Sequence, residues 1–166
     1  MNHNTIANHI VELLREAQVL ALQGFGISNI LQPGIIKELI MANVLGHQII
    51  PQKDASDAKD KDGNMYEYLA SINRIEVRTN KGCSFQIDRI VKNNLSRVTR
   101  NKAFFFGIFK DHLELEEIWE IDIPTVLEEV QRQLASCKNE IAHVNFLLKW
   151  VKENGGKVFP KESCRA

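Results

Sequence analysis

Apolar side chains recur every three or four residues at the start of the chain, at Ile6, Ile10, Leu13, Leu14, Ala17 and Ala21. This period predicts a helix from about residue 5 to residue 23, which Gly24 ends. The apolar stripe can pack on the core of its own domain or help to form a dimer. A second helix is expected over 35–45, because Gly46 follows its last apolar position.

Later stretches have the patterns of strands. Residues 103–109 are nearly all apolar and are bounded by charges, which is typical of a buried central strand. In 113–121, Leu113 and Leu115 are expected to face inward, with a bulge at Glu116-Glu117. Further strands are expected over 65–71, 74–79 and 157–159, and further helices over 124–134 and 145–154. Residues 83–101 are polar and basic, with apolar positions at mixed helical spacing.

This order of elements predicts one α/β domain over residues 1–166, with a mixed central β-sheet flanked by helices. No apolar run approaches the roughly 20 residues that a membrane span needs, and no signal peptide precedes the first helix. Cys83, Cys137 and Cys164 are odd in number and widely spaced, which argues against a disulfide framework. A reducing, cytoplasmic location is therefore expected.

The charges are unevenly distributed although the formal net charge is +0. From Arg74 to Lys102 there are eight basic residues against two acidic ones, whereas 111–129 holds eight acids and no Lys or Arg. A folded chain can thus present a basic face, which is the electrostatic footprint of nucleic-acid binding. The alternative is a solvated surface.

Two carboxylates flank a predicted hairpin. Asp62-Gly63 favours a tight turn because Gly adopts a positive φ freely. Asp57 lies before this turn and Glu67 lies on the strand after it. A hairpin can bring two such residues to one point at the end of a sheet, where their oxygens suit a hard cation such as Mg²⁺. The alternative is that the acidic residues form a solvated turn.

Three short motifs of this segment, Asp57-Ala58-Lys59-Asp60, Tyr66-Glu67 and Ser71-Ile72-Asn73, resemble the PD-(D/E)xK nuclease superfamily. Within that superfamily they are most similar to type II restriction endonucleases. Weaker matches continue in order from Leu20 to Phe159, so the resemblance covers nearly the whole chain.

The resemblance implies a restriction-endonuclease-like fold and magnesium-dependent, sequence-specific cleavage of double-stranded DNA at a palindromic site. It implies a homodimer, to which the helix over 5–23 contributes. Asp57 and Glu67 would bind Mg²⁺, together with a backbone carbonyl near Tyr68. An acid on the second helix touches the metal site in many of these nucleases, and Glu38 is the candidate here. A favourable place near the helix N-terminus also explains Glu38.

One position departs from the family pattern, which has Lys two residues after the Glu. Leu69 stands there, or Ala70 if the alignment is anchored on Ser71-Ile72-Asn73. Residues two apart on a strand share a face, so the missing amine would have been close to the metal. Another lysine can substitute (Lys59 first, otherwise Lys53 or Lys61), the metal alone can activate water, or the chain is inactive. We expect the chain to cleave slowly or not at all, and Leu69→Lys to raise cleavage without changing the site that is cut. If Lys59 or Lys61 already supplies the charge, Leu69→Lys should instead crowd the site.

The resemblance places base recognition in the polar, basic stretch that follows the hairpin. The candidate DNA-binding residues are Lys81, Ser84, Gln86, Asp88, Arg89, His143 and Asn145. Arg and Gln can pair in bidentate fashion with guanine and adenine. Rival functions are a junction-resolving nuclease of the same superfamily, a DNA-binding protein that does not cleave, and an interaction domain.

Overall fold

The computed structural model describes residues 3–52, 55–73 and 83–160. Its helices are α1 (His3–Phe25), α2 (Ile35–Leu45), α3 (Ser96–Thr99), α4 (Ile123–Ser136) and α5 (Leu148–Asn154). Its strands are β1 (Gln48–Ile49), β2 (Ala58–Lys59), β3 (Met65–Ile72), β4 (Ser84–Val91), β5 (Ala103–Phe109), β6 (Leu115–Asp122), β7 (Ile141–Leu147) and β8 (Gly156–Phe159).

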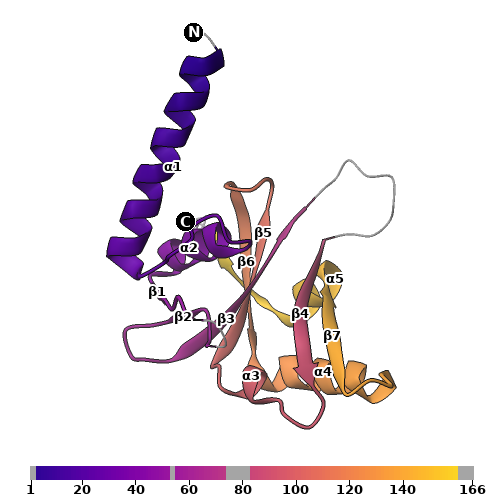
Figure 1. Ribbon diagram of the computed structural model, residues 1–166. Coiled ribbons are helices and arrows are strands. Elements are labelled where there is room, and N and C mark those ends of the chain that lie inside the picture. The colour runs from indigo at the N-terminus through magenta and orange to yellow at the C-terminus, as the bar shows by residue number, and fades with distance from the viewer. Residues whose placement is uncertain (1–2, 53–54, 74–82, 161–166) are drawn as a thin grey trace, which may run out of the picture.

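The main sheet is mixed, as the sequence predicts. Its strand order is β1-β2-β3-β5-β6-β8. The central neighbours β3 and β5 run parallel, and the other neighbouring pairs are antiparallel. Strands β4 and β7 form a separate antiparallel ribbon beside the main sheet (Figure 1). The expected α/β architecture is therefore confirmed.

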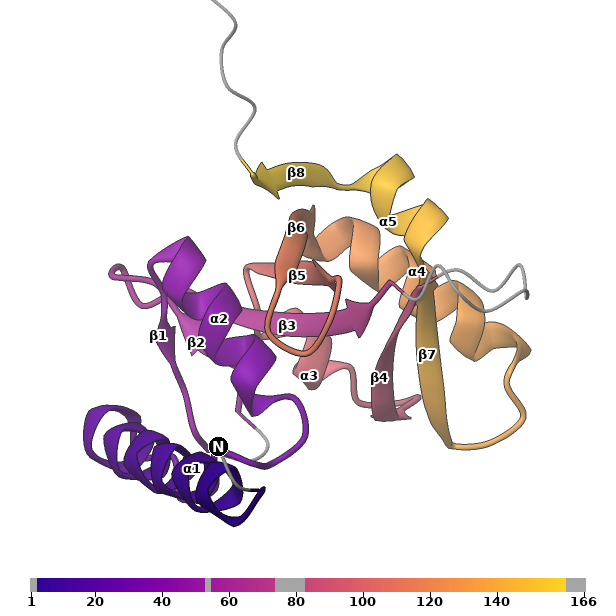
Figure 2. The ribbon, with the colours of Figure 1, turned by 90° about the horizontal axis from the view of Figure 1, so that it is seen from above.

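Strand β5 is buried along its whole length because both of its faces are covered. Phe104 and Phe106 pack into one core with residues of α4 and the ribbon. Phe105 and Phe109 pack into a second core with residues of α2. Figure 2 accordingly shows α2 and α4 on opposite sides of β5 and β6. Side chains alternate between these two cores along β3 as well, which decides where the site residues of that strand point.

The ribbon corrects one prediction and explains one sequence pattern. The helix expected from residue 145 begins at Leu148, after β7, and the mixed helical spacing over 83–101 belongs to strand β4 and the short α3. The reason is a bulge: the pairing of β4 with β7 shifts between Ile87 and Ile90, so both of these residues face inward although they are three apart. That spacing imitates a helix in the sequence.

Strand β6 bears out one prediction and overturns another. Ile108 pairs with Glu117 and Phe109 pairs with Leu115, so the expected bulge lies at Glu116. Leu113 was expected to face inward, but it is exposed because the chain is still in the loop before β6. The strand expected over 74–79 lies outside the described residues.

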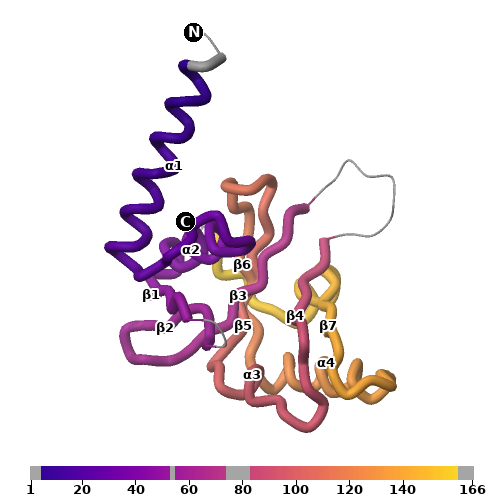
Figure 3. The backbone as a smooth tube through the Cα atoms, in the orientation of Figure 1, coloured from indigo at the N-terminus to yellow at the C-terminus, as the bar shows by residue number. Residues whose placement is uncertain are grey.

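Helix α1 extends away from the rest of the chain (Figure 3). Ala21 is buried in a small cluster, and Ala17 packs against it. The side chain of Gln18 donates to the carbonyl of Ile27 and accepts from the N–H of Ile30. The larger apolar residues of α1 remain exposed, namely Ile6, Ile10, Val11, Leu13, Leu14, Val19, Leu20, Leu22 and Phe25. No described helix, α1 included, has the length and apolar character needed to cross a membrane.

Candidate active site

The hairpin between β2 and β3 is built around Asp60. This carboxylate accepts hydrogen bonds from the backbone N–H groups of Asp62 and Asn64, and from the Tyr66 hydroxyl at 2.8 Å. The side chain of Asn64 donates a further hydrogen bond to Asp60. This bond has the largest effect on the pKa of Asp60, and together the hydrogen bonds lower it. Gly63 has a φ of 83°, as the predicted turn requires. Asp60 therefore fixes the turn, and its position relative to β3 is set locally.

The turn brings Asp57 to Glu67. Ala58 pairs with Tyr66 across the hairpin, so the next step of the same register places Asp57 opposite Glu67. The N–H of Asp57 donates to the Tyr66 carbonyl at 3.0 Å, and the N–H of Tyr68 donates to Oδ2 of Asp57 at 2.7 Å. Glu67 is 2% exposed. The two carboxyl groups therefore meet at the end of the sheet and do not form part of a solvated turn.

Burial and mutual repulsion shape the electrostatics of this pair. Burial raises the pKa of Asp57, although the Tyr68 N–H acts in the opposite direction. Burial also raises the pKa of Glu67, and the nearby Asp57 raises it further. Two carboxylates held this closely without a cation favour the protonated form of one of them.

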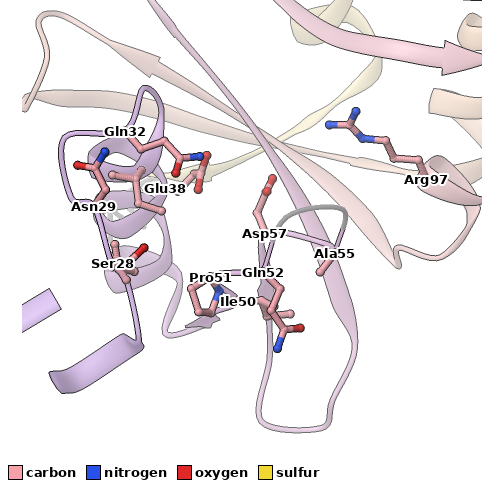
Figure 4. Close-up of a pocket in the computed structure, with 12 residues that line it drawn as sticks. Ser28, Asn29, Gln32, Glu38, Ile50, Pro51, Gln52, Ala55, Asp57 and Arg97 are labelled. Carbon is pink, nitrogen blue, oxygen red and sulfur yellow. The ribbon is translucent and has the colours of Figure 1, made fainter. Parts of the chain in front are cut away.

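Glu38 joins the pair from α2. Burial, followed by the charge of Asp57, raises the pKa of Glu38 to about 7. Glu38 and Asp57 line one cavity of about 180 Å³, and Arg97 from α3 lines it as well (Figure 4). Glu38 thus shares this cavity with Asp57. We call Glu38, Asp57 and Glu67 the carboxylate site.

Two arginines that the sequence analysis did not single out lie beside Glu67. Nη2 of Arg97 is 3.3 Å from Oε1 of Glu67, and Nη2 of Arg100 is 4.0 Å from Oε2. Arg100 also donates to the carbonyl of Ala55 at 2.7 Å. Both arginines belong to the basic run that the sequence displays, and their spacing of three was the available signal. Their approach to Glu67 comes from the tertiary fold.

The carboxylate site fits a magnesium ion. Oε2 of Glu67 is buried and accepts no hydrogen bond, and the nearest cation is Nη2 of Arg100 at 4.0 Å, so this oxygen has room for a closer ligand. The described residues contain no group of three His, Cys, Asp or Glu arranged to hold a metal. Mg²⁺ commonly takes one or two carboxylates and completes its shell with water and phosphate oxygens, so Asp57 and Glu67 are a sufficient protein contribution.

The structure shows which of Leu69 and Ala70 shares a face of β3 with Glu67. Leu69 packs in the same core as Phe104 and Phe106, on the face of β3 that carries Glu67. Ala70 packs against the opposite core, together with Tyr66 and Tyr68. Leu69 is therefore the position that shares a face with Glu67. Its surroundings are apolar.

The lysines proposed as substitutes are less well placed. Lys59 pairs with Met65, which lies two residues before Glu67 and therefore on the same face of β3. Lys59 is partly exposed. No ion pair joins Lys59 to any carboxylate among the described residues. Lys61 is exposed at the turn, and Lys53 lies outside the described part of the chain.

The predicted DNA-binding residues gather on the exposed face of the ribbon. Gln86 on β4 pairs with Asn145 on β7, and both are exposed, as is Ser84. Nδ1 of His143 lies 2.7 Å from Oδ1 of Asp88, and Gln86 donates to that same oxygen. We call these five residues the ribbon face. Its members come from two segments more than fifty residues apart. The alternate residues of the same two strands, on the opposite face of the ribbon, pack into the core.

Arg89 is a special case within β4. It lies at the bulge and has a φ of 58°, which non-glycine residues rarely adopt. Its side chain is exposed. Strain of this kind in a bulge redirects a side chain relative to its neighbours. Lys81 lies outside the described residues.

Comparison with known proteins identifies a family for this chain. A family model described as Restriction endonuclease PvuII matches residues 2–159. The matched range contains the hairpin, the arginines of α3 and both strands of the ribbon. No curated protein matches the sequence.

Proposed function

Because the chain belongs to the family of the restriction endonuclease PvuII, we propose that it cleaves double-stranded DNA at a specific palindromic site with the help of Mg²⁺. The observation that carries this proposal is the meeting of Asp57 and Glu67 at the end of the hairpin, with a buried carboxylate oxygen that accepts no hydrogen bond. These are the two acids that the nuclease motif requires.

In this proposal Asp57 and Glu67 hold the metal ion. When bound, the ion lowers the pKa of a water molecule and offsets negative charge on the phosphate. The N–H of Tyr68 keeps Asp57 in its orientation, and the carbonyl of the same residue is a candidate further ligand. Glu38 contributes a third carboxyl group across the cavity, where it would accept a hydrogen bond from a water molecule.

The ribbon face would read the bases. A two-stranded ribbon fits the major groove, and amide and guanidinium groups can pair there with base edges. Gln86, Arg89 and Asn145 supply such groups on exposed positions. His143 contacts both Asp88 and Gln86 through hydrogen bonds. This part of the surface is therefore ordered before DNA binds.

We propose that the protein acts as a two-fold dimer formed through α1. The two strands of a palindrome are related by two-fold symmetry, so two copies of one site are needed to cut both. The exposed apolar residues of α1 support this arrangement, because such a face is unfavourable in water. A second copy of the same helix is the partner that covers it.

Digestion of a long plasmid tests the function. The parent chain with Mg²⁺ should give discrete fragments, and Glu67→Gln should give none although its fold is retained. Glu128→Gln, an exposed change on α4, is the matched control and should cut like the parent. Cutting confined to junction substrates would favour a resolving nuclease. Binding without cutting would favour the non-cleaving alternative, for which the apolar Leu69 is the main argument.

A further inference from the structure

The carboxylate site lacks the lysine of the nuclease motif, yet a cation does lie beside it. We propose that the guanidinium of Arg97 contacts the scissile phosphate and supplies the positive charge that Leu69 cannot. This inference rests on the proposed nuclease function. It assigns a catalytic contact to a residue on a different element from the motif.

The position of Arg97 matches this role. Its Nη2 atom lies 3.3 Å from Oε1 of Glu67, and its side chain lines the cavity that Asp57 and Glu38 also line. The side chain of Arg97 is 44% exposed, whereas that of Glu67 is 3% exposed. Arg97 thus extends from the buried carboxylate towards the solvent side from which DNA must approach.

Arg97 is also held in place before any substrate binds. Its Nη1 atom donates to the carbonyl of Asp88 at 2.8 Å. Its own carbonyl accepts from the side chain of the buried Asn101 at 2.9 Å, and the adjacent Val98 is fully buried. A charge that is fixed in advance stabilises a developing charge without the cost of reorganisation.

The other cations near the site have a weaker claim. Arg100 is 4.0 Å from Glu67 and is engaged with the Ala55 carbonyl, which directs its guanidinium towards the backbone before β2. Arg97 lines the shared cavity, and Lys59 and Lys61 do not. A guanidinium also presents two parallel N–H groups that match two phosphate oxygens.

The chemical role follows from these contacts. A bond forms between the water oxygen and phosphorus as the bond from phosphorus to the leaving sugar oxygen breaks. The water loses one proton to solvent, and the leaving oxygen gains one. A guanidinium offers N–H donors and has no acceptor. It therefore stabilises charge on the phosphate and does not act as a general base.

Three measurements on Arg97→Ala test the role, with Arg97→Lys as the conservative variant and Arg132→Ala on α4 as the control. Single-turnover cleavage with Mg²⁺ should fall about 100-fold or more in Arg97→Ala, as expected for loss of a preorganised charge. Arg97→Lys should retain activity within about tenfold, since it keeps the charge. The control should match the parent.

The other two readouts do not depend on cleavage. With Ca²⁺ in place of Mg²⁺, loss of a phosphate contact should lower the salt dependence of DNA binding by about one unit of slope. Calorimetry with Ca²⁺ alone should show affinity equal to or above that of the parent, because a competing cation has left Glu67. A purely structural Arg97 would instead give weaker Ca²⁺ binding and an unchanged slope, and that result would overturn the inference.

The outcomes separate the two proposals. If the parent cleaves DNA and the cleavage rate of Arg97→Ala is within threefold of it, Arg97 does not have the proposed role. The proposed nuclease function would be unaffected by that result. A parent that binds DNA but never cuts removes the nuclease function, and the catalytic role of Arg97 with it. Thermal melting of each variant shows whether a loss of activity comes from unfolding.

Discussion

The backbone N–H of Tyr68 donates a 2.7 Å hydrogen bond to Oδ2 of Asp57, eleven residues earlier in the chain. The residue that follows one proposed metal ligand therefore orients the other. Asp57 also lines the cavity shared with Glu38. The orientation of Asp57 is thus set by a hydrogen bond within the hairpin.

The stability of the metal-free protein should depend on pH through Glu38. The folded state raises its pKa to about 7, so folding favours the protonated form. The related stability is fully present below about pH 4.5 and is lost as the pH rises through about 7. Glu38→Gln should therefore be the more stable protein at pH 8, by about 1–3 kcal/mol after allowance for solvent contact.

Denaturant unfolding at pH 4 and pH 8 measures this effect. Glu38→Gln and the parent should differ little at pH 4, and Glu128→Gln should follow the parent at both values. Added Ca²⁺ should stabilise the parent at pH 8, because the cation compensates the carboxylates. If the free energy of unfolding depends on pH in the same way for Glu38→Gln and the parent, the pKa of Glu38 is not raised in the folded protein.

The Arg97 proposal changes the expectation for Leu69→Lys. Since Arg97 already supplies a cation, the new lysine should not raise cleavage by the parent. Placing an ammonium among Phe104 and Phe106 should lower the free energy of unfolding by about 2–5 kcal/mol. Leu69→Met should cost less than about 1.5 kcal/mol.

The double variant gives the sharper result. In the Arg97→Ala background, Leu69→Lys should restore cleavage about tenfold or more, because the amine shares a face with Glu67. Denaturant titrations and single-turnover cleavage measure the two effects. A strong gain of cleavage in the otherwise unchanged protein would mean that the site had lacked a cation, contrary to the role given to Arg97.

Base recognition should depend on the ribbon face and its bulge. Gln86→Ala and Arg89→Ala should each cost about 1–3 kcal/mol at the cognate site and little on random DNA. Asn145→Ala should behave in the same way, because Asn145 lies opposite Gln86. Competition binding in Ca²⁺ measures the difference between the two sequences. An equal loss on both would reassign the residue to phosphate contact.

Dimer formation should depend on the exposed face of α1. Leu13→Asp should shift the protein to monomers in analytical ultracentrifugation and slow cleavage of both strands. Leu113→Asp places the same charge at another exposed leucine and should leave the dimer intact. Dimers that persist in Leu13→Asp would move the interface to another part of the surface.

Local signals predicted the carboxylate hairpin and the buried strand over 103–109, because a turn residue and an unbroken apolar run act over short distances. The ribbon was harder to predict. Its bulge at Arg89 replaces the period of two by a spacing of three, and residues 92–140 separate β7 from β4 in the sequence. Arg97 illustrates the remaining limit: nothing near it in the sequence indicates that the crossover between β3 and β5 ends beside Glu67.

The parallel strands β3 and β5 are neighbours in the sheet, but β4 and α3 lie between them in the sequence. The parts of the site are therefore synthesised at different times. A nascent chain that ends after β3 already carries Asp57 and Glu67, but Arg97 emerges later and β7 later still. The recognition ribbon can close only when residue 147 has left the ribosome. Domains of this size fold as units, so an unfinished chain would hold acids without either the cation or the groups that read bases. Under the proposed nuclease function, a truncated product would therefore lack both the phosphate contact and the base contacts.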